Sequence, residues 1–272
     1  MNPRALLGAR GLRPKKSLGQ NFLMDSGTSA RIARLAVDAP GERVLEVGAG
    51  TGSLTAALLA AGAELTTFEL DDALVEILRS RADLAGARIE HADALAFDYA
   101  AYGGERPWRV AGNLPYNIAT PVLLKLAQLE RPPDRIVAMI QKDVADRLLA
   151  KPGTSAYGSL TVALAVAMRV ERAFSVAPGQ FFPRPKVVSS VVVLHRLAAP
   201  LVDARDRPRF EQVVRGAFAY RRKTLANSLA LALELPRERI ATALLALELD
   251  ADIRGEALDL RTFAALTDAL AH

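Results

Sequence analysis

The sequence predicts an α/β fold: a doubly wound, mostly parallel seven-stranded sheet followed by a small all-helical domain. Between residues 43 and 194, short β-branched or apolar runs alternate with helical stretches, which is typical of parallel strands joined by helices. Beyond about residue 197 the strand signals stop and four helical stretches follow. We therefore divide the chain into a basic arm (1–20), a sheet domain (21–197) and a helical domain (198–272).

The predicted elements follow one another in a regular order. A strand at 43–47 leads through a glycine-rich turn to a helix at 53–61, and a strand at 64–69, a helix at 73–82 and a short strand at 88–91 come next. A fourth strand at 108–111 ends at Gly112, and the helix at 121–129 carries proline in its first turn, where no N–H is needed. A strand at 134–140 and a helix beginning at 144 precede two closely spaced strands at 174–176 and 189–194, so we expect one antiparallel strand. The helical stretches are 206–219, 223–233, 237–247 and 260–271.

Composition excludes several classes of site. The 272 residues are 51% hydrophobic and 24% charged, so the chain can bury a core without a structural metal. The absence of cysteine excludes disulfides, thiolate zinc sites, iron–sulfur clusters and cysteine nucleophiles. The three histidines are far apart and lack metal-binding spacing, so we expect no metal.

Hydropathy gives no sign of a membrane protein. The longest apolar run, Leu160 to Met168, is about half the length of a membrane span and is followed by Arg169. The amino terminus has no apolar core of the signal-peptide type. We therefore expect a cytoplasmic protein without membrane contact, and a monomer.

Positive charge is concentrated in the arm. The first 21 residues contain five basic side chains and no acid, whereas the whole chain has a net charge of +5, so residues 22–272 sum to zero. The basic residues are Arg4, Arg10, Arg13, Lys15 and Lys16. Such an arm suits a polyanion such as RNA, because cationic contacts with phosphates release counterions. A basic leader without a partner is the alternative.

A glycine-rich turn, Glu46-Val47-Gly48-Ala49-Gly50-Thr51-Gly52, follows the first strand. In a doubly wound sheet, ligands bind beyond the carboxyl ends of the strands, and glycines there let a ligand approach the backbone. Glu69 ends the second strand, where a carboxylate can accept hydrogen bonds from both hydroxyls of a ribose, and Asp93 follows the third, within reach of an adenine amino group. Dinucleotide enzymes share such a turn, so an oxidoreductase is an alternative, although the chain offers no residue for hydride chemistry.

Asn113-Leu114-Pro115-Tyr116 follows the fourth strand at the same edge of the sheet. The amine of adenine is a poor nucleophile because its lone pair is delocalised into the ring, and an oxygen acceptor on each N–H would bring that lone pair forward. The Asn113 amide oxygen and the Leu114 carbonyl can be those acceptors, Pro115 fixes one backbone torsion, and Tyr116 offers a face for stacking. Taken by themselves, these four residues are also compatible with a turn that contains a buried tyrosine. Because they follow a strand at the same edge of the sheet as the glycine-rich turn, we predict instead that they serve the methylation of an amine.

Together these two motifs resemble those of the S-adenosylmethionine-dependent methyltransferases, and Asn-Leu-Pro-Tyr matches the signature of enzymes that methylate conjugated amino nitrogens. The resemblance implies a Rossmann-like class I methyltransferase fold with S-adenosylmethionine as cofactor. It places Gly48 and Gly50 beside the methionine part of the cofactor, Glu69 on the ribose and Asp93 on the adenine.

Further segments narrow the resemblance to the ribosomal RNA adenine-N6,N6-dimethyltransferases, and within that family to the bacterial group that acts on small-subunit (16S) RNA. They are Lys16 to Leu23, Gln141 to Leu148, Lys151 to Gly158, Phe181 to Val187, Arg221 to Leu225 and Asn227 to Leu229. The resemblance runs from about residue 15 to about residue 229. It adds Asn21, Leu23 and Asn113 to the cofactor site.

For the RNA, the resemblance implies that Phe181 stacks on the target adenine opposite Tyr116. Phe182 stands where the family often has a small or polar residue, so either ring is a candidate for that contact. A base must leave its helix to reach a buried methyl group, and two aromatic rings replace the lost stacking. Arg221, Arg222 and Lys223 form a second basic cluster for RNA, with a solvated helix face as the alternative.

The resemblance therefore implies methyl transfer to N6 of two adjacent adenines near the 3′ end of 16S RNA, with a role in small-subunit biogenesis. One alternative is the sister group that dimethylates an adenine of 23S RNA and confers antibiotic resistance. Another is a non-catalytic RNA-binding assembly factor with the same fold.

Overall fold

The computed structural model describes residues 2–200, 202 and 206–271. Its internal contacts divide the chain into a sheet unit (residues 1–145 and 170–196) and a helical unit (residues 146–169 and 197–272). The sequence-based division put residues 146–169 with the sheet, but in the structure they pack with the C-terminal helices. Met1 and His272, the ends of the predicted arm and helical domain, lie outside the described residues.

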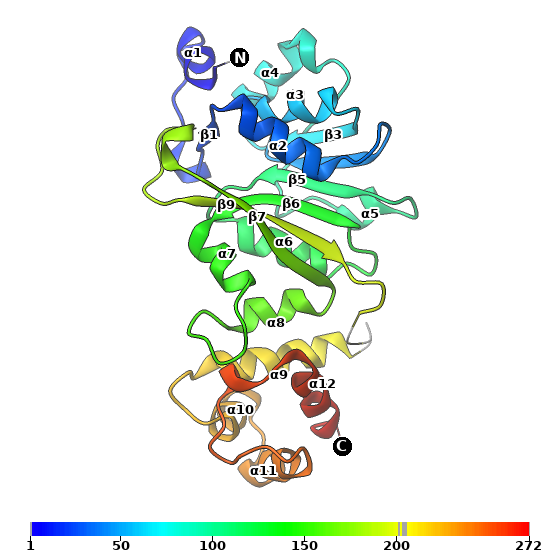
Figure 1. Ribbon diagram of the computed structural model, residues 1–272, viewed down its shortest axis with the longest axis vertical. Coiled ribbons are helices and arrows are strands. Elements are labelled where there is room, and N and C mark those ends of the chain that lie inside the picture. The colour runs from blue at the N-terminus through cyan, green and yellow to red at the C-terminus, as the bar shows by residue number, and fades with distance from the viewer. Residues whose placement is uncertain (1, 201, 203–205, 272) are drawn as a thin grey trace. The chain divides into compact units, whose positions relative to one another are not determined.

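The main sheet has seven strands in the order β4-β3-β2-β5-β6-β9-β7 (Figure 1). β2 is parallel to β3 and β5, β3 to β4, and β5 to β6, whereas β9 is antiparallel to β6. The predicted doubly wound, mostly parallel sheet with one late antiparallel strand is confirmed. The strands are β2 (Arg43–Val47), β3 (Glu64–Glu69), β4 (Arg88–His91), β5 (Arg109–Asn113), β6 (Arg135–Gln141), β7 (Met168–Val176) and β9 (Ser189–Arg196).

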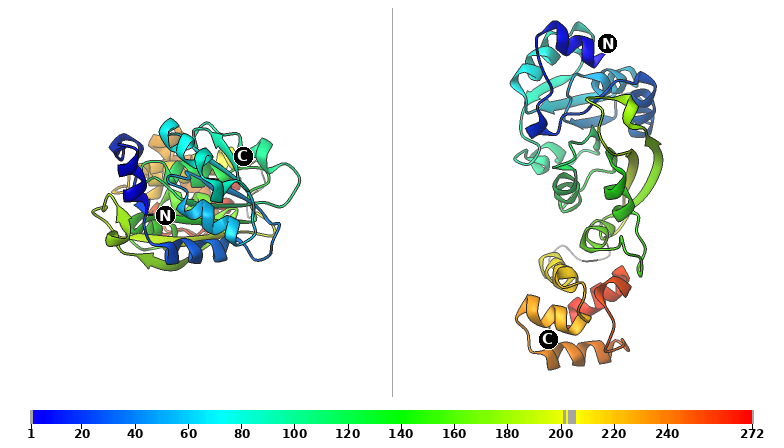
Figure 2. Two further views of the ribbon diagram at one scale, coloured as in Figure 1. Left: turned by 90° about the horizontal axis from the view of Figure 1, so that it is seen from above. Right: turned by 90° about the vertical axis from the view of Figure 1, so that its left-hand side faces the viewer.

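Helices cover both faces of the sheet (Figure 2). Ile32 of α2 and Leu54 of α3 pack in one core cluster with Val44 and Val137 of the strands. Side chains alternate along a strand, so the neighbouring buried residues face the other side, where Figure 1 shows α6. The helices of the sheet unit are α2 (Ser26–Ala36), α3 (Ser53–Ala60), α4 (Asp72–Ser80), α5 (Tyr99–Gly103) and α6 (Ala119–Ala127), with 3₁₀ helices at Ala82–Leu84 and Pro178–Gln180. The helix α7 (Lys142–Leu148) begins in the sheet unit and ends in the helical unit.

The basic arm is folded and packs on the sheet unit. It contains α1 (Pro3–Ala9) and a 3₁₀ helix at Lys16–Leu18, and Leu7 of α1 lies in a cluster with Leu74 and Ile77 of α4. A two-stranded antiparallel sheet, β1 (Phe22–Leu23) with β8 (Phe181–Phe182), joins the end of the arm to the segment before β9. The sequence predicted neither α1 nor this small sheet.

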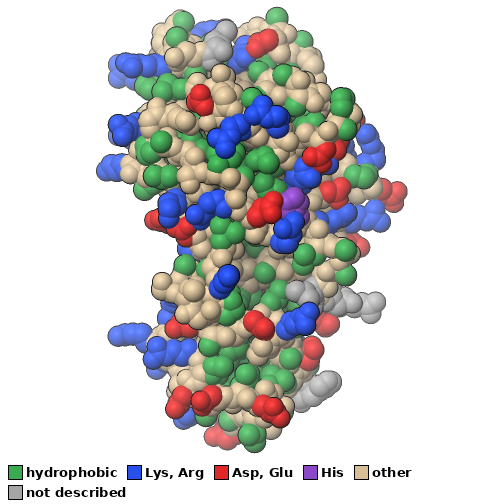
Figure 3. Space-filling view, in the orientation of Figure 1, with side chains coloured by type: hydrophobic (Ala, Val, Ile, Leu, Met, Phe, Trp, Pro, Cys, Tyr) green, Lys and Arg blue, Asp and Glu red, His purple; other side chains and the backbone are tan. Residues whose placement is uncertain are grey.

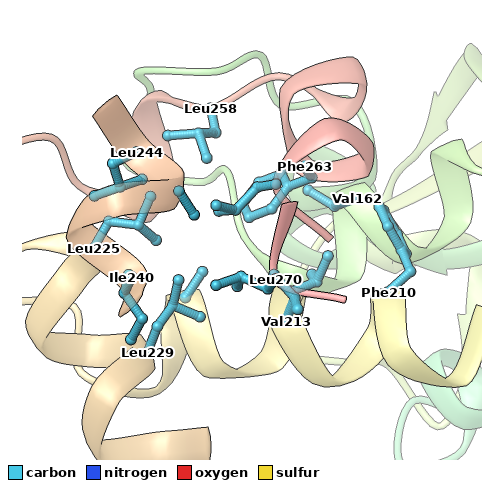
Figure 4. Packing of buried hydrophobic residues seen from close by; sticks show 14 of the residues in the cluster. Val162, Phe210, Val213, Leu225, Leu229, Ile240, Leu244, Leu258, Phe263 and Leu270 are labelled. Atoms are coloured by element: carbon cyan, nitrogen blue, oxygen red, sulfur yellow. The ribbon is translucent and has the colours of Figure 1, made fainter. Parts of the chain in front are cut away.

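The helical unit has its own hydrophobic core. Phe210, Val213, Leu229, Ile240 and Phe263 meet there from four helices (Figure 4). The four predicted helices are present, and the apolar run at 160–168 supplies a fifth, α8, which packs on α9. The helices are α8 (Ser159–Ala165), α9 (Arg207–Ala219), α10 (Leu225–Leu233), α11 (Arg237–Ala246) and α12 (Leu260–Ala269), with a 3₁₀ helix at Gly255–Ala257. Within the described part of the chain, no helix combines the length and apolarity needed to cross a membrane.

Candidate functional site

One pocket opens beyond the carboxyl ends of β2, β3, β4 and β5 in the sheet unit. Its lining brings together segments that are far apart in the sequence: residues 18–23, 46–51, 68–70, 92–95 and 113–118. Every residue predicted to hold the cofactor or to carry the reaction lines this pocket. These residues are Asn21, Leu23, Gly48, Gly50, Glu69, Asp93, Asn113, Leu114, Pro115 and Tyr116.

The turn after β2 has the left-handed backbone that glycine allows. Gly48, Gly50 and Gly52 have φ angles of +74°, +56° and +81°. A Cβ atom at Gly52 would lie 2.7 Å from Leu84, so that position has no room for a side chain, whereas at Gly48 the nearest atom would be 3.9 Å away, on Pro115. The turn is therefore tightly packed at Gly52. At Gly48, which lines the pocket, the backbone is not covered by a side chain.

Glu69, at the end of β3, joins two walls of the pocket. Its Oε2 accepts a hydrogen bond from the N–H of Gly50 at 2.8 Å, and its Oε1 accepts from the N–H groups of Leu70 and Asp71 at 2.9 and 3.1 Å. The residue is only 8% exposed, yet it lines the pocket. A carboxylate has about four acceptor positions, and three of these are used, so about one remains for a ligand hydroxyl.

Glu46 is buried directly behind the glycine turn. Its Oε2 accepts a hydrogen bond from Thr55 Oγ1 at 2.6 Å. Burial raises the pKa of Glu46 to about 7, although the hydrogen bond from Thr55 acts in the opposite direction. Sequence reasoning placed Glu46 in the turn without giving it a role, because its burial depends on packing against β3 and α3.

The end of the arm is tied to the turn after β3. Asp71 accepts hydrogen bonds from Lys15 Nζ at 2.8 Å and from Gln20 Nε2 at 2.9 Å. The N–H of Lys15 donates to Gln20 Oε1 at 2.7 Å. Because residues 18–23 line the pocket, this network holds one pocket wall against the turn that contains Glu69. Sequence reasoning missed Gln20 and Asp71, whose pairing spans 51 positions.

Asn113 ends β5, and its side chain has a defined orientation. Its Nδ2 donates to the carbonyl of Asn21 at 2.8 Å, and the Nδ2 of Asn21 donates to the carbonyl of Gly19 at 3.0 Å. With the nitrogen of the Asn113 amide bonded to Asn21, its oxygen is the acceptor that remains for a ligand. The next peptide is fixed by the N–H of Leu114, which donates to the Met139 carbonyl of β6 at 3.1 Å.

Tyr116 is half-buried at the pocket wall. Its hydroxyl lies 2.8 Å from Ser189 Oγ of β9. Burial raises the pKa of the Tyr116 hydroxyl, so the side chain is neutral at physiological pH. The ring thus offers an uncharged aromatic surface at the Asn113 end of the pocket.

Asp93 and two leucines form the end of the pocket beyond Glu69. Asp93 Oδ1 accepts a hydrogen bond from the N–H of Leu95 at 2.8 Å. Leu70 and Leu95 line the same region and are each 43% exposed, which is high for large apolar side chains. An apolar edge next to a carboxylate suits a flat heterocycle that carries an amino group.

The structure places the predicted aromatic partners outside this pocket. Phe181 is 2% exposed and belongs to the core cluster that contains Leu23 and Val176. Phe182 packs with Leu7 of α1, and the guanidinium of Arg4 lies 5.6 Å from the centre of its ring. The reason is the pairing of β1 with β8, which fixes both rings beside the arm. Base stacking by either ring stays a prediction.

The predicted basic cluster lies between α9 and α10 of the helical unit. Arg221, Arg222 and Lys223 are exposed, but Arg221 Nη2 donates to the carbonyl of Ser155 at 2.9 Å. One member of the cluster therefore also holds the loop before α8. On the face drawn in Figure 3, basic and acidic side chains are interspersed.

The pocket suits S-adenosylmethionine by the chemistry of its lining. Glu69 and Asp93 place hydrogen-bond acceptors at the ends of β3 and β4, the glycine turn leaves room beside the backbone, and Leu70 and Leu95 supply an apolar edge. Asn113 and Tyr116 line the other end of the pocket, beyond β5. The lining offers no cysteine or histidine, the usual ligands of a transition metal.

Comparison with known proteins agrees with this arrangement. A family model described as ribosomal RNA adenine dimethylase matches residues 11–254. The chain is 44% identical over 265 residues to "Ribosomal RNA small subunit methyltransferase A" of Geobacter sulfurreducens, covering 96% of each protein. It is 42% identical over 263 residues to the protein of that name from Pseudomonas aeruginosa, again covering 96% of each.

Solved structures share the fold. A dimethyladenosine transferase from Plasmodium falciparum superposes with a TM-score of 0.75 at 24% identity, covering 90% of this chain and 95% of that one. The 23S rRNA methyltransferase ErmE superposes with a TM-score of 0.67 at 26% identity, covering 92% of this chain and all of that one. Both similarities extend over most of the chain.

Proposed function

Because the chain belongs to the ribosomal RNA adenine dimethylase family, we propose that it transfers methyl groups from S-adenosylmethionine to N6 of two adjacent adenines near the 3′ end of 16S RNA. Both adenines become dimethylated, as a step in small-subunit biogenesis in the cytoplasm. The observation that best supports this proposal is the orientation of the Asn113 side-chain amide. Its nitrogen donates to the Asn21 carbonyl, and its oxygen is left as an acceptor at the pocket. Identity above 40% to proteins named for the small subunit supports that substrate.

The residues that would hold the cofactor lie on the turns after β2, β3 and β4. Gly48 and Gly50 would border the methionine part, Glu69 would accept from the ribose, and Asp93 would accept from the adenine. Asn21 and Leu23, which follow the arm, would close the remaining side. When bound, S-adenosylmethionine supplies a methyl group on a positively charged sulfur, which is already activated toward a nucleophile.

The chain's own part in the reaction is to prepare the amine. The Asn113 oxygen and the Leu114 carbonyl would each accept one N–H of the target amino group, which draws its lone pair out of conjugation. Pro115 and the hydrogen bond from the Leu114 N–H to Met139 fix the direction of this peptide. No strong general base is required, so positioning supplies much of the rate.

For the RNA, we propose stacking of the extruded base on Tyr116, with Phe181 or Phe182 as the second aromatic partner. Phe181 is in the core in this structure, so its participation requires that β8 separate from β1. Arg221, Arg222, Lys223 and the arm are the proposed phosphate contacts. A monomer suffices for this scheme, because every proposed cofactor residue belongs to one sheet unit.

The direct test is methylation of isolated ribosomal subunits with labelled S-adenosylmethionine. We expect label in immature small subunits, mapped by mass spectrometry to two neighbouring dimethylated adenines. Label in large subunits would instead favour the 23S alternative. Cofactor binding without a product on either subunit would favour a non-catalytic assembly factor.

Asn113→Ala tests the proposed acceptor. Loss of a hydrogen bond made in the transition state should reduce turnover by about 100-fold. The affinity for S-adenosylmethionine, measured by calorimetry, should stay within a few-fold of wild type, because Glu69 and Asp93 are untouched. Turnover close to that of wild type would show that Asn113 is not the acceptor.

A further inference from the structure

Two buried serines follow each other in β9. Ser189 and Ser190 are both 0% exposed, and neighbouring side chains of a strand point to opposite faces of the sheet. Ser189 Oγ lies 2.8 Å from the Tyr116 hydroxyl. Ser190 Oγ is buried with no hydrogen-bond partner among the described residues. The same hydroxyl group therefore has two different environments at adjacent positions.

The strand fixes Ser189 in place. β9 pairs with β6 in antiparallel register, with Ser189 opposite Gln141 and Val191 opposite Met139. At the end of this ladder the N–H of Lys142 donates to the Val188 carbonyl at 2.9 Å. Ser189 is therefore itself a paired position of the sheet, so its backbone is held in place beside the hydroxyl of Tyr116.

The two ends of Tyr116 are thus attached to one pair of strands. Two residues before it, the Leu114 N–H donates to the Met139 carbonyl of β6 at 3.1 Å, and the Tyr116 hydroxyl is bonded to Ser189 of β9. Pro115, which lies between Leu114 and Tyr116, has a fixed φ angle. A tyrosine ring has two rotatable side-chain bonds. With the chain held at Leu114 and the hydroxyl held at Ser189, both bonds are restricted, and with them the plane of the ring.

We infer that Ser189 is a positioning residue for methyl transfer, which fixes the plane of the Tyr116 ring against which the target base stacks. This inference rests on the proposed function, because it gives the ring a role in holding the base in line with the methyl group. Ser189 does not line the pocket and acts only through Tyr116. Ser190 has no such role.

The serine pair supplies a matched control. Ser189→Ala should lower kcat about 5- to 20-fold, because one net hydrogen bond is lost and a small misplacement of a reacting group is costly in rate. Ser190→Ala should retain wild-type kcat, because it removes a buried hydroxyl that has no partner. Both variants should bind S-adenosylmethionine as wild type does and unfold at nearly the same temperature.

Tyr116→Phe keeps the ring and removes its hydroxyl, so it should lower kcat by a similar factor. In the double variant Tyr116→Phe with Ser189→Ala the loss should be no larger than in either single variant, since both remove one shared interaction. Ser189→Thr, which retains the hydroxyl on a side chain suited to a strand, should restore most of the activity. Losses that multiply in the double variant would contradict the shared role.

A second measurement follows the ring directly and does not depend on turnover. The chain has five tyrosines, so the ring resonances of Tyr116 can be assigned in ¹³C-tyrosine-labelled protein by comparison with Tyr116→Phe. Ser189→Ala should shift or broaden them, and Ser190→Ala should not. Unchanged Tyr116 resonances in Ser189→Ala, or equal loss of turnover in both serine variants, overturns the inference. If the wild type methylates neither subunit, the proposed function fails while the resonances still test the contact.

Discussion

The two ends of the main sheet use charged residues in different ways. At the amino ends of the strands, arginine is the first residue of β2, β5 and β6, and Arg109 and Arg135 both pair with Asp38 at 2.8 Å. At the carboxyl ends, Glu46 and Glu69 are bonded to hydroxyl and N–H groups instead. Carboxylates at the amino end are therefore paired with arginine, whereas at the carboxyl end Glu46 is buried and Glu69 lines the pocket, where it keeps an acceptor position for a ligand.

The pKa values of two carboxyl groups shift in opposite directions at these two ends. The hydrogen bond from Arg135, together with that from Arg109, holds the pKa of Asp38 below its usual value. Burial raises the pKa of Glu46 to about 7. A lowered pKa gives stability that is lost as the pH falls below about 4, whereas a raised pKa of an acid gives stability that is lost as the pH rises.

The largest expected effect is the pH dependence caused by Glu46. Between its unfolded pKa near 4.5 and its folded pKa of about 7, the folded state binds more protons, so the free energy of unfolding falls as the pH rises. Glu46→Gln cannot ionise and should remove this slope. Relative to wild type, the variant should gain on the order of 3 kcal/mol between pH 4.5 and 8, measured by urea unfolding.

Asp38→Asn is the control for that experiment. Because the pKa of Asp38 is lowered, this variant should be less stable than wild type by a constant amount between pH 4.5 and 8, with the same slope, and the slopes should differ only at more acidic pH. An unchanged slope in Glu46→Gln would contradict a protonated Glu46 behind the glycine turn.

The next effect concerns the two ends of a single strand. Glu69→Gln places an amide N–H₂ group where the carboxylate accepts from backbone N–H groups and, by our proposal, from the ribose. Hydrogen bonds to a charged group contribute about 1.5–3 kcal/mol, so the Kd for S-adenosylmethionine should rise roughly 10- to 100-fold, as measured by calorimetry.

Glu64→Gln, at the first residue of the same strand, is the matched control. Glu64 pairs with Arg106 at 2.8 Å, and both side chains are more than half exposed. The affinity for the cofactor should therefore be unchanged. Equal losses in both variants would mean that the effect comes from β3 as a whole rather than from the carboxyl end.

The sequence predicted the site better than its surroundings. The strands and the glycine turn carry local signals, because alternating β-branched residues and glycine at left-handed positions reflect the backbone directly. Residues at the ends of parallel strands meet at one edge in any such sheet, so Glu69, Asp93 and Asn113 could be placed together without coordinates.

The parts that could not be predicted depend on contacts between distant residues. β1 and β8 have two residues each and pair although they are far apart in the sequence. Two residues are too few to show the alternation of apolar and polar side chains that predicts a strand. That pairing buries Phe181, although the resemblance implied that its ring stacks on the target adenine. The contact of Tyr116 with Ser189 spans 73 positions. We also did not predict α2, although this helix has a local signal, since Asp25 caps it by accepting from the N–H of Thr28 at 2.7 Å.

The smallest effect tests whether the amino end of the sheet is purely structural. Arg109 is 16% exposed, pairs with Asp38 and Glu42, and donates from Nη1 to the Ala36 carbonyl at 2.9 Å. Arg109→Met leaves two carboxylates and a carbonyl without this donor, so the free energy of unfolding should fall by about 1–2 kcal/mol, between the values for exposed and buried pairs.

Arg88, the first residue of β4, is the control for Arg109, because its side chain is 77% exposed and pairs only with Glu90 in the described ion pairs. Arg88→Met should change the free energy of unfolding by less than about 0.5 kcal/mol, since exposed pairs contribute little. Neither variant should alter the Kd for S-adenosylmethionine. A weaker affinity in Arg109→Met would show that the two ends of the sheet are coupled through β5, because Asn113 ends the strand that Arg109 begins.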